Sequence, residues 1–587
     1  MSRRLRAWLG VILFAAAIAA TRLPLTPRQL YSFDDVNFAW AVGKFDIRHS
    51  QPHPPGYPLF VLQMRVLDAL RFKRAESKLV VLALLGSLAA VLLAHRLGNL
   101  FFEGDAGLCG ALLLLFYPAF WYAGLTSAVR IQLAVVSVAV AAACWRAWRG
   151  ERRWLFWSAG VLGVGAGIRP ELGLLLLPLW AASVFRAKAG RRHGLLGLAV
   201  LAAAVLAWLA PLMMLSGGAK DYFALCWKYL RDQAALTSPL FGAGEAMWRT
   251  TVSRLLVWTF VGLPAWLLPL ALVWRGGRAA VLSREQWLFL AVWFLPSLAF
   301  ALLVHVADAG QTLAMSPVVC LVGGCLMSRA LDEVEARASR WHGLIWMLTV
   351  AALWLAFSLA TASQTVLLIA VIALAAGWAM RLGPRGSPPP RGHGLVFLLV
   401  PALFLHGLVF LHRGWYHAAG TSGGVAGVVH RWLEDLHSGL AFISLDQVRL
   451  TASLDDRTLR AVDQLTRKHP RLAVILWERG LTSWRKVAYY YHYLPLVVLD
   501  RKTLAGPAPA VATIWRGSRL EQRVEGSTPL PIALPRGGRL IWLLNPKSDL
   551  PPRLREHFVL AEMDTVYFCD LPEAGGSRQV GDFLLLW

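Results

Sequence analysis

The chain has 587 residues, of which 57% are hydrophobic, and its mean hydropathy is +0.52. Soluble globular proteins contain about 45–50% apolar residues, so this composition excludes an ordinary soluble protein and predicts a polytopic membrane protein. The formal net charge is +25, but the basic residues are scattered between apolar segments. That distribution indicates that the basic residues lie in cytoplasmic loops and contact lipid headgroups, rather than forming a nucleic-acid binding surface.

The N-terminus begins with basic residues and continues into an apolar run that ends in small residues. It therefore resembles a signal peptide. Because the chain continues directly into further apolar segments, we interpret Ala7–Thr21 as an uncleaved first membrane span.

The first loop, residues 22–78, contains an adjacent acidic pair, Asp34 and Asp35, just after the first span. Adjacent side chains at a helix start point about 100° apart, so only one of the two is expected to face a ligand. The other is suited to cap the helix by accepting backbone N–H bonds. Asp35–Lys44 is predicted to be a helix in the membrane interface.

The sequence QPHPPGYPLF, Gln51–Phe60, follows in the same loop. Its prolines fix φ and Gly56 permits a turn, which predicts a stiff segment that returns to the membrane at a set position. His53 and Tyr57 are candidates to hydrogen-bond a sugar or a phosphate, and the alternative is a purely structural turn. Pro58–Leu70 covers only about 20 Å, too short for a bilayer core of about 30 Å, and is predicted to be a juxtamembrane helix.

Apolar runs continue as far as Leu411, and with the first span they predict about thirteen transmembrane helices. The predicted spans are Ala7–Thr21, Leu79–Leu97, Ala106–Tyr122, Ser127–Trp145, Trp154–Ile168, Glu171–Val184, Gly194–Leu215, Thr251–Trp274, Gln286–Val304, Thr312–Met327, Gly343–Leu359, Thr365–Met380 and Gly394–Leu411.

From residue 146 onward every second loop is basic, namely 146–153, 186–192, 275–284, 329–340 and 381–391, the last overlapping the Gly383–Gly394 connector. The positive-inside rule places these loops in the cytoplasm. The N-terminus is then cytoplasmic, and the first loop lies on the outer face with the loop 216–250. We therefore expect an inner (plasma) membrane protein with a periplasmic or extracytoplasmic C-terminal domain.

Four polar residues in short loops on this predicted outer face are candidates for donor binding. Arg169 stands between two apolar spans, where a guanidinium suits a phosphate; the alternatives are pairing with Glu171 or a lipid headgroup. Arg130, in a neighbouring loop, is a second candidate for the same role. His305 and Asp308 are candidates to line a sugar pocket, and the alternative is a simple polar loop.

From Arg413 onward the composition becomes that of a small α/β domain. Strands are predicted at Leu472–Trp477, Leu496–Leu499, Arg539–Leu544 and Phe583–Leu586, with a helix at Asp456–Lys468. The aromatic and basic stretch Trp477–Pro495 predicts either an acceptor- or glycan-binding face or a packed helix with solvated charges.

Metal and cofactor binding have weak sequence support. The six cysteines show no CxxC and no zinc spacing. Asp34, Asp35 and His49 offer oxygen and imidazole ligands to a divalent cation, but no further carboxylate clearly converges on them. We expect a metal-independent protein with no cofactor and leave a divalent metal to experiment.

The acidic pair, the PHPPGYPL run and the juxtamembrane helix together resemble the GT-C superfamily of integral membrane glycosyltransferases. The chain is similar to the protein O-mannosyltransferases and the lipid A aminoarabinose transferases, with further support at Gly165–Pro178 and His305–Pro317. The resemblance implies a polyprenyl-phosphate sugar donor and a catalytic base at Asp34, with Asp35 as the alternate. Where the family often has a Gly-Tyr pair, this chain has Gly310-Gln311.

The sequence thus predicts a catalytic transmembrane domain at residues 1–412 and an extracytoplasmic α/β domain at 413–587. The expected activity is transfer of a sugar from the lipid-linked donor to a protein, glycolipid or polysaccharide acceptor on the outer face, by inverting displacement with an Asp base. Two alternatives are a transporter or flippase of lipid-linked glycans and a non-catalytic envelope assembly protein. Internal repeats and midplane charges, which transporters usually show, are not evident in the sequence.

Overall fold

The computed structural model describes residues 3–187, 190–275, 282–337, 391–411, 424–467, 473–478, 480–500, 510–526, 529–544, 550–580 and 582–587. The chain divides into two compact units, Met1–Thr26 with Asp46–Val448, and Pro27–Phe45 with Arg449–Trp587. The predicted spans Gly343–Leu359 and Thr365–Met380 lie outside the described residues, as do residues 412 and 413 at the predicted domain boundary and most of the Gly383–Gly394 connector.

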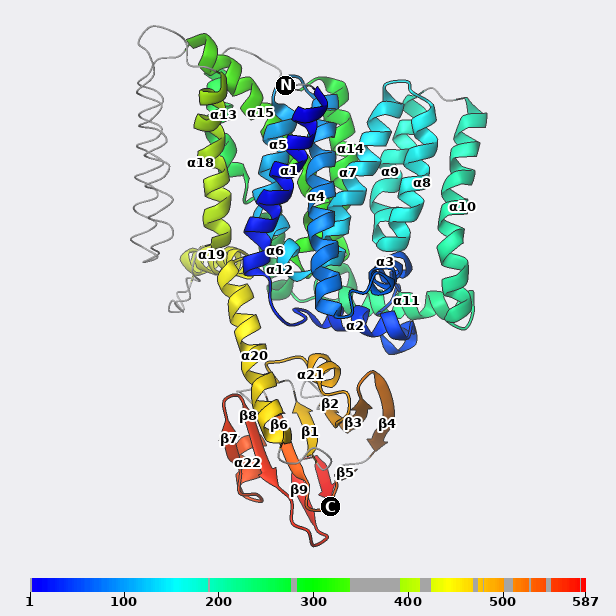
Figure 1. Cartoon of the computed structure of the whole chain (residues 1–587), viewed down its shortest axis with the longest axis vertical. Helices are drawn as coiled ribbons and strands as arrows, with labels where there is room; N and C mark the ends of the chain where they lie inside the picture. Colours follow the sequence, from blue (N-terminus) through cyan, green and yellow to red (C-terminus); the bar gives the residue numbers. More distant parts are fainter. Residues whose placement is uncertain are drawn as a thin grey trace. The chain divides into compact units, whose positions relative to one another are not determined.

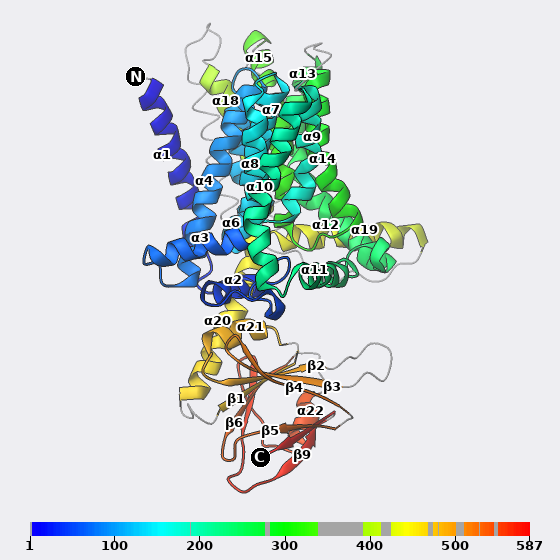
Figure 2. The same ribbon diagram turned by 90° about the vertical axis from the view of Figure 1, so that its right-hand side faces the viewer.

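The first unit is helical, and its long helices run side by side in both views (Figures 1 and 2). Its helices are α1 (Arg3–Arg22), α3 (Pro58–Ala69), α4 (Ala75–Phe101), α5 (Ala106–Phe116), α6 (Pro118–Thr126), α7 (Ala128–Trp148), α8 (Arg153–Ile168), α9 (Glu171–Arg186), α10 (Arg191–Leu215), α11 (Ala219–Ala234), α12 (Glu245–Phe260), α13 (Leu267–Arg275), α14 (Arg284–Leu303), α15 (Ser316–Arg337), α18 (Arg391–Leu411) and α19 (Gly424–Phe442).

Five helical segments among the described residues are long and apolar enough to cross a membrane, or six if α5 and α6 form one bent span. Pro118 begins α6 and lacks the N–H that would continue the α5 ladder, and the two helices meet at 53°. The predicted span Thr251–Trp274 is interrupted after Phe260, where a turn and the short 3₁₀ helix Leu263–Trp266 separate α12 from α13. The predicted total of about thirteen stays a prediction.

Small residues allow the central helices to approach closely. One face of α4 buries Gly86, Ala90, Ala94 and Gly98, which are four residues apart and therefore stack on one side of the helix. A Cβ on Gly98 would lie 2.5 Å from the Cα of Gly107 in α5, so the two backbones touch at this point. Such small-residue contacts are a usual way for helices to pack in a bilayer, where lipid tails are as apolar as leucine.

Two shorter helices, α3 and α11, lie across the ends of the long helices, at the end of this unit away from the N-terminus (Figures 1 and 2). The predicted juxtamembrane segment Pro58–Leu70 corresponds to α3. The loop 216–250 contains α11, whose first turn is tied to the first loop by a hydrogen bond of 3.1 Å from the Tyr222 hydroxyl to the Pro55 carbonyl.

The second unit is built on a seven-stranded sheet of order β4-β3-β2-β1-β6-β8-β7, with a three-stranded sheet β5-β10-β9 beside it (Figure 1). Strand β1 pairs in parallel with β2 and with β6, and the other pairs of the large sheet are antiparallel. The strands are β1 (Ala473–Glu478), β2 (Pro495–Asp500), β3 (Ala510–Arg516), β4 (Arg519–Gly526), β5 (Leu530–Ala533), β6 (Arg539–Leu544), β7 (Ala561–Met563), β8 (Val566–Asp570), β9 (Ser577–Val580) and β10 (Phe583–Leu586).

The four strands predicted from the sequence are β1, β2, β6 and β10, so the C-terminal β-sheet region is confirmed. Helix α20 (Leu445–Arg467) includes the predicted helical stretch from Asp456 as far as Arg467, and it packs on the sheet through Val462 and Leu465. Helices α21 (Trp484–Tyr490) and α22 (Leu550–Arg555) complete the domain.

One segment of the first loop folds with this domain. Residues Pro27–Phe45, which include α2 (Phe33–Gly43), belong to the second unit although more than 400 residues separate them from the rest of it. Trp40 packs against the cluster of buried side chains around β1 and β6. The acidic pair is therefore part of the C-terminal unit.

Candidate active site

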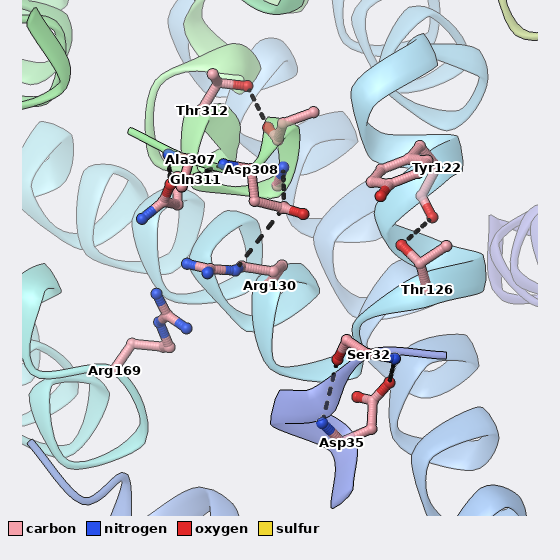
Figure 3. Close-up of polar contacts among 12 residues, drawn as sticks. Ser32, Asp35, Tyr122, Thr126, Arg130, Arg169, Ala307, Asp308, Gln311 and Thr312 are labelled. Carbon is pink, nitrogen blue, oxygen red and sulfur yellow. Dashed lines mark hydrogen bonds and ion pairs between the residues drawn. The ribbon is translucent and has the colours of Figure 1, made fainter. Parts of the chain in front are cut away.

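The acidic pair lies in the first turn of α2, and a capping box fixes that turn. Ser32 is the N-cap residue, and its hydroxyl accepts a 3.1 Å hydrogen bond from the Asp35 amide. The Asp35 carboxylate in turn accepts a 2.9 Å bond from the Ser32 amide (Figure 3). Both bonds satisfy N–H groups that a helix start leaves without partners, which is why a Ser-x-x-Asp sequence begins a helix here.

Burial changes the acidity of Asp35. Only 3% of the residue is exposed, and this burial raises the pKa of its carboxyl from 3.8 to about 7. The hydrogen bonds with Ser32 and the charge of Lys486 act in the opposite direction, while the neighbouring Asp34 raises it further. Asp35 therefore has the features of a structural carboxyl, neutral or nearly so below pH 7.

Asp34 has a different position in the same turn. It is half-buried, whereas Asp35 is buried, and it takes no part in the capping box. The sequence predicts that one acid of the pair caps the helix and the other faces a ligand. In the structure Asp35 has the capping role, as the acid that accepts the Ser32 amide in the capping box, and Asp34 remains the candidate for chemistry.

The proline-rich segment of the first unit is a closed turn. The backbones of Asp46 and Gln51 exchange two hydrogen bonds, of 2.6 and 2.9 Å. Gly56 then adopts φ +110°, and a Cβ there would lie 3.2 Å from Ile47 and Leu212. Only glycine fits such a site comfortably. The turn delivers Tyr57 as the residue before α3, with Pro58 in the first helical position.

His53, Tyr57 and Arg169 form one buried cluster. The His53 Nε2 atom and the Tyr57 hydroxyl share a 3.0 Å hydrogen bond, and the Arg169 guanidinium lies 5.0 Å from the centre of the Tyr57 ring. Tyr229 of α11 adds a ring 5.3 Å from that of His53. Burial raises the pKa of Tyr57 above its usual value, while the positive charges of Arg169 and Arg130 act against that rise. The Tyr57 hydroxyl therefore stays protonated and able to donate.

The two arginines differ in how their charges are matched. Arg169 is 3% exposed and forms an ion pair with Glu171, which was one of the alternatives that the sequence left open. Arg130, at the start of α7, makes a long ion pair of 3.9 Å with Asp308 (Figure 3). Its Nη1 atom is buried and has no hydrogen-bond partner among the described residues. The charge of Arg130 is therefore matched less closely than that of Arg169, which makes Arg130 the stronger candidate for an anion.

His305 and Asp308, which lie in the loop after α14, both have hydrogen-bond partners within the first unit. The Asp308 carboxylate accepts a 2.7 Å bond from the Gly310 amide and caps the 3₁₀ helix Ala309–Ala314, while the Gln311 side chain accepts from the Asp308 amide (Figure 3). His305 shares a 2.8 Å bond with Thr237, and burial lowers its pKa to about 4, helped by Arg130. His305 is therefore a neutral hydrogen-bonding group at pH 7.

The structure accordingly gathers six predicted site residues within the first unit. They are His53, Tyr57, Arg130, Arg169, His305 and Asp308. The two acids Asp34 and Asp35 belong to the second unit. Sequence reasoning missed Tyr229 and Thr237, which lie near the end of an amphipathic helix with no local motif. Only the aromatic content of the loop 216–250 pointed to that region.

No group of three or more His, Cys, Asp or Glu side chains among the described residues is arranged to hold a metal ion. His49, one of the ligands considered from the sequence, lies 2.9 Å from the carboxylate of Asp46. The expectation of metal-independent action stays a prediction for experiment.

Residues 45–193 match a family model described as the N-terminal domain of the protein O-mannosyl-transferase TMEM260. This match covers the proline-rich loop and helices α3 to α9. No curated protein sequence matches the chain.

Two solved structures share the fold over almost the whole chain. Both are crystal structures of ArnT from Cupriavidus metallidurans, each 16% identical to this chain and covering 96% of it and 98% of the ArnT chain. The TM-score is 0.58 for the apo form and 0.55 for the form bound to undecaprenyl phosphate. The chain therefore has a helical fold like that of ArnT, with a C-terminal β-sheet region.

Proposed function

We propose that this protein is a membrane glycosyltransferase that moves a sugar from a polyprenyl-phosphate donor to an acceptor hydroxyl, with Asp34 as the general base. The fold, the family match to a protein O-mannosyltransferase domain and the first-loop acid all support this reaction class. The observation that carries the choice of base is the capping box, because it commits the Asp35 carboxylate to the Ser32 amide.

The chemistry needs one carboxylate. The acceptor oxygen attacks the anomeric carbon, and the bond from that carbon to the phosphate oxygen breaks. The bonding electrons leave with the phosphate, which departs as an anion and needs no acid. The acceptor proton passes to the carboxylate of Asp34. Attack opposite to the leaving group inverts the anomeric configuration.

The donor phosphate is assigned to the first unit. ArnT has been crystallised with undecaprenyl phosphate, and a lipid carrier of this kind suits a chain with several apolar helices. Arg130 is the first choice to bind the phosphate, because its ion pair with Asp308 is long, at 3.9 Å, whereas Arg169 is closely paired with Glu171. Arg169, held by Glu171 and by the Tyr57 ring, supplies a second positive charge, and the Tyr57 hydroxyl and His53 supply hydrogen bonds to the sugar.

The reaction is proposed for the outer face of the inner (plasma) membrane. The alternating basic loops support this side, as does the placing of α3 and α11 at the end of the helical unit away from the N-terminus (Figure 2). The acceptor is a hydroxyl-bearing protein, glycolipid or polysaccharide. The match to a protein O-mannosyl-transferase domain supports a protein as the first acceptor to test.

Envelope mass spectrometry tests the proposal as a whole. Glycans of cells that lack the gene are compared with those of the same cells expressing the parent protein or Asp34→Asn. We expect a glycan that requires the parent protein and is missing in both other strains. Identical glycans in all three strains, with the proteins present in the membrane, would refute the proposed activity.

A further inference from the structure

We propose that Arg485 of the C-terminal domain is a positioning residue for the catalytic carboxylate, acting through its hydrogen bond to Asn37. The inference rests on the proposed role of Asp34 and extends the active site to a domain that the family match at residues 45–193 does not reach. It concerns only residues of the second unit.

The contact itself is short and partly buried. The Arg485 Nη1 atom donates a 2.8 Å hydrogen bond to the Asn37 Oδ1 atom, and only 1% of Asn37 is exposed. Asn37 lies three residues after Asp34, so the two side chains are neighbours on one face of α2. Holding Asn37 therefore sets the rotation of the helix face that carries Asp34. A hydrogen bond from a charged donor is well suited to this, because it is stronger than a neutral one.

Other contacts in the same unit hold the segment on both sides of Asp34. Before it, the Leu30 amide donates a 3.0 Å bond to the Tyr490 hydroxyl. After it, the rings of Trp40 and Trp484 lie with their centres 6.5 Å apart. Both partners lie in α21, so one short helix of the C-terminal domain contacts the acidic segment before and after Asp34.

Helix α21 is itself firmly anchored. Lys486, next to Arg485, forms a buried ion pair with Asp455 of α20 and lies 5.8 Å above the Tyr31 ring. The Arg485 guanidinium stacks 4.7 Å from the centre of the Trp484 ring, which restricts its side chain before it reaches Asn37. A pre-ordered arginine on an anchored helix can fix the position of a carboxylate, whereas a mobile surface arginine cannot.

A double-mutant cycle tests the contact. Arg485→Ala, Asn37→Ala and the double variant are purified as full chains and assayed with undecaprenyl phosphomannose and undecaprenyl phosphoaminoarabinose as donors. Arg485→Lys serves as the conservative variant. Arg523→Ala is the matched control, because Arg523 is an exposed arginine of the same domain whose partner, Glu525, lies on the same strand.

We expect each single variant to lower kcat about 10- to 100-fold, the size of effect that a small misplacement of a catalytic group produces. The donor KM should stay within about threefold of the parent value, because the donor phosphate is assigned to the other unit. The double variant should lose no more than the worse single variant, since both remove one contact. Arg485→Lys should recover part of kcat, and Arg523→Ala should match the parent.

Amide hydrogen exchange gives a readout that needs no substrate. Residues 34–43 should exchange faster in Arg485→Ala and Asn37→Ala, while β1 and β6 keep the parent protection, which also shows that the domain remains folded. Unchanged exchange in α2 would overturn the inference even if neither donor is turned over by the parent protein.

The kinetic outcomes separate the inference from the proposed function. If Asp34→Asn is inactive while Arg485→Ala and Asn37→Ala keep full kcat, the positioning role is wrong and the base assignment stands. Additive losses in the double variant would also overturn it. Full activity of Asp34→Asn in the same assay would instead overturn the proposed function.

Discussion

At the scale of single residues, the structure distinguishes two neighbouring acids that the sequence could only present as a pair. Asp35 is buried and bonded to the Ser32 amide, so its oxygens are used by the backbone. Asp34, the preceding residue of the same turn, takes no part in the capping box. A general base must accept the proton of the acceptor hydroxyl, and Asp35 already accepts the Ser32 amide, so Asp34 is the acid proposed for that role.

Asp35→Asn should remove a pH-dependent cost to stability. Burial raises the pKa of the folded-state carboxyl from 3.8 to about 7, so the folded protein binds more protons than the unfolded chain between those values. The protonated Asp35 carboxyl therefore makes its full contribution to stability below about pH 4. That contribution is lost as the pH rises towards 7. The free energy of unfolding that is lost over this pH range is at most about 4 kcal/mol.

An asparagine at this position still accepts the Ser32 amide through Oδ1, so the cap is kept. Thermal unfolding in detergent should show the melting temperature of Asp35→Asn rising relative to the parent between pH 4 and 7, then levelling off. A constant difference across that range would contradict the burial of a neutral carboxyl.

The two arginines of the first unit should respond differently to substitution. Arg130→Ala is expected to raise the donor KM at least about tenfold, the usual cost of losing a hydrogen bond to a charged group, with little change in melting temperature. Arg169→Ala should instead lower stability by about 3–5 kcal/mol, because it leaves Glu171 without its partner.

The matched control for Arg169→Ala is the double variant Arg169→Met with Glu171→Leu, which removes both charges and should restore most of the lost stability. Steady-state kinetics measure the donor KM of each variant, and melting curves on the same preparations measure its stability. An unchanged donor KM in Arg130→Ala would exclude Arg130 as the main phosphate ligand.

At the scale of elements, the proline-rich loop depends on one glycine. Gly56→Ala places a methyl group at φ +110° and within 3.2 Å of Ile47 and Leu212, so we expect a cost of at least about 1–2 kcal/mol and a rise in donor KM as His53 and Tyr57 shift. Gly160→Ala in α8 is the control, since its Cβ would meet only Val200 at 3.9 Å and alanine favours a helix. Equal melting temperatures and kinetics for the two variants would show that the turn is not constrained.

Local sequence patterns predicted most elements because their causes are local. Strands β6 and β10 begin and end where the apolar runs do, and α3 begins at the proline that fixes its first φ angle. The break after Phe260 was missed, since hydropathy averages over a run and does not register how Gly262 and Pro264 interrupt the backbone. The gathering of His53, Arg169 and Tyr229 depends on tertiary contacts, which no local pattern encodes.

At the scale of the whole molecule, the division into two units does not follow the order of the chain. Sequence composition predicted a change of domain near residue 413, but nothing in it indicated that Pro27–Phe45 folds with Arg449–Trp587. The contacts responsible, such as the bond of 2.9 Å from Gln29 to Asp456, join residues more than 400 positions apart. We consequently expect that activity requires both the acidic loop and the C-terminal domain, although only the acidic loop contains a recognisable motif.

The most direct test of the central claim is single-turnover transfer from a polyprenyl-phosphate sugar by the parent protein, Asp34→Asn and Asp35→Asn. Removal of a general base costs about 10²- to 10⁴-fold, so Asp34→Asn should fall by that factor while Asp35→Asn stays within about tenfold of the parent. The product should have the inverted anomeric configuration. Comparable rates for Asp34→Asn and the parent, or a retained configuration, would contradict the account.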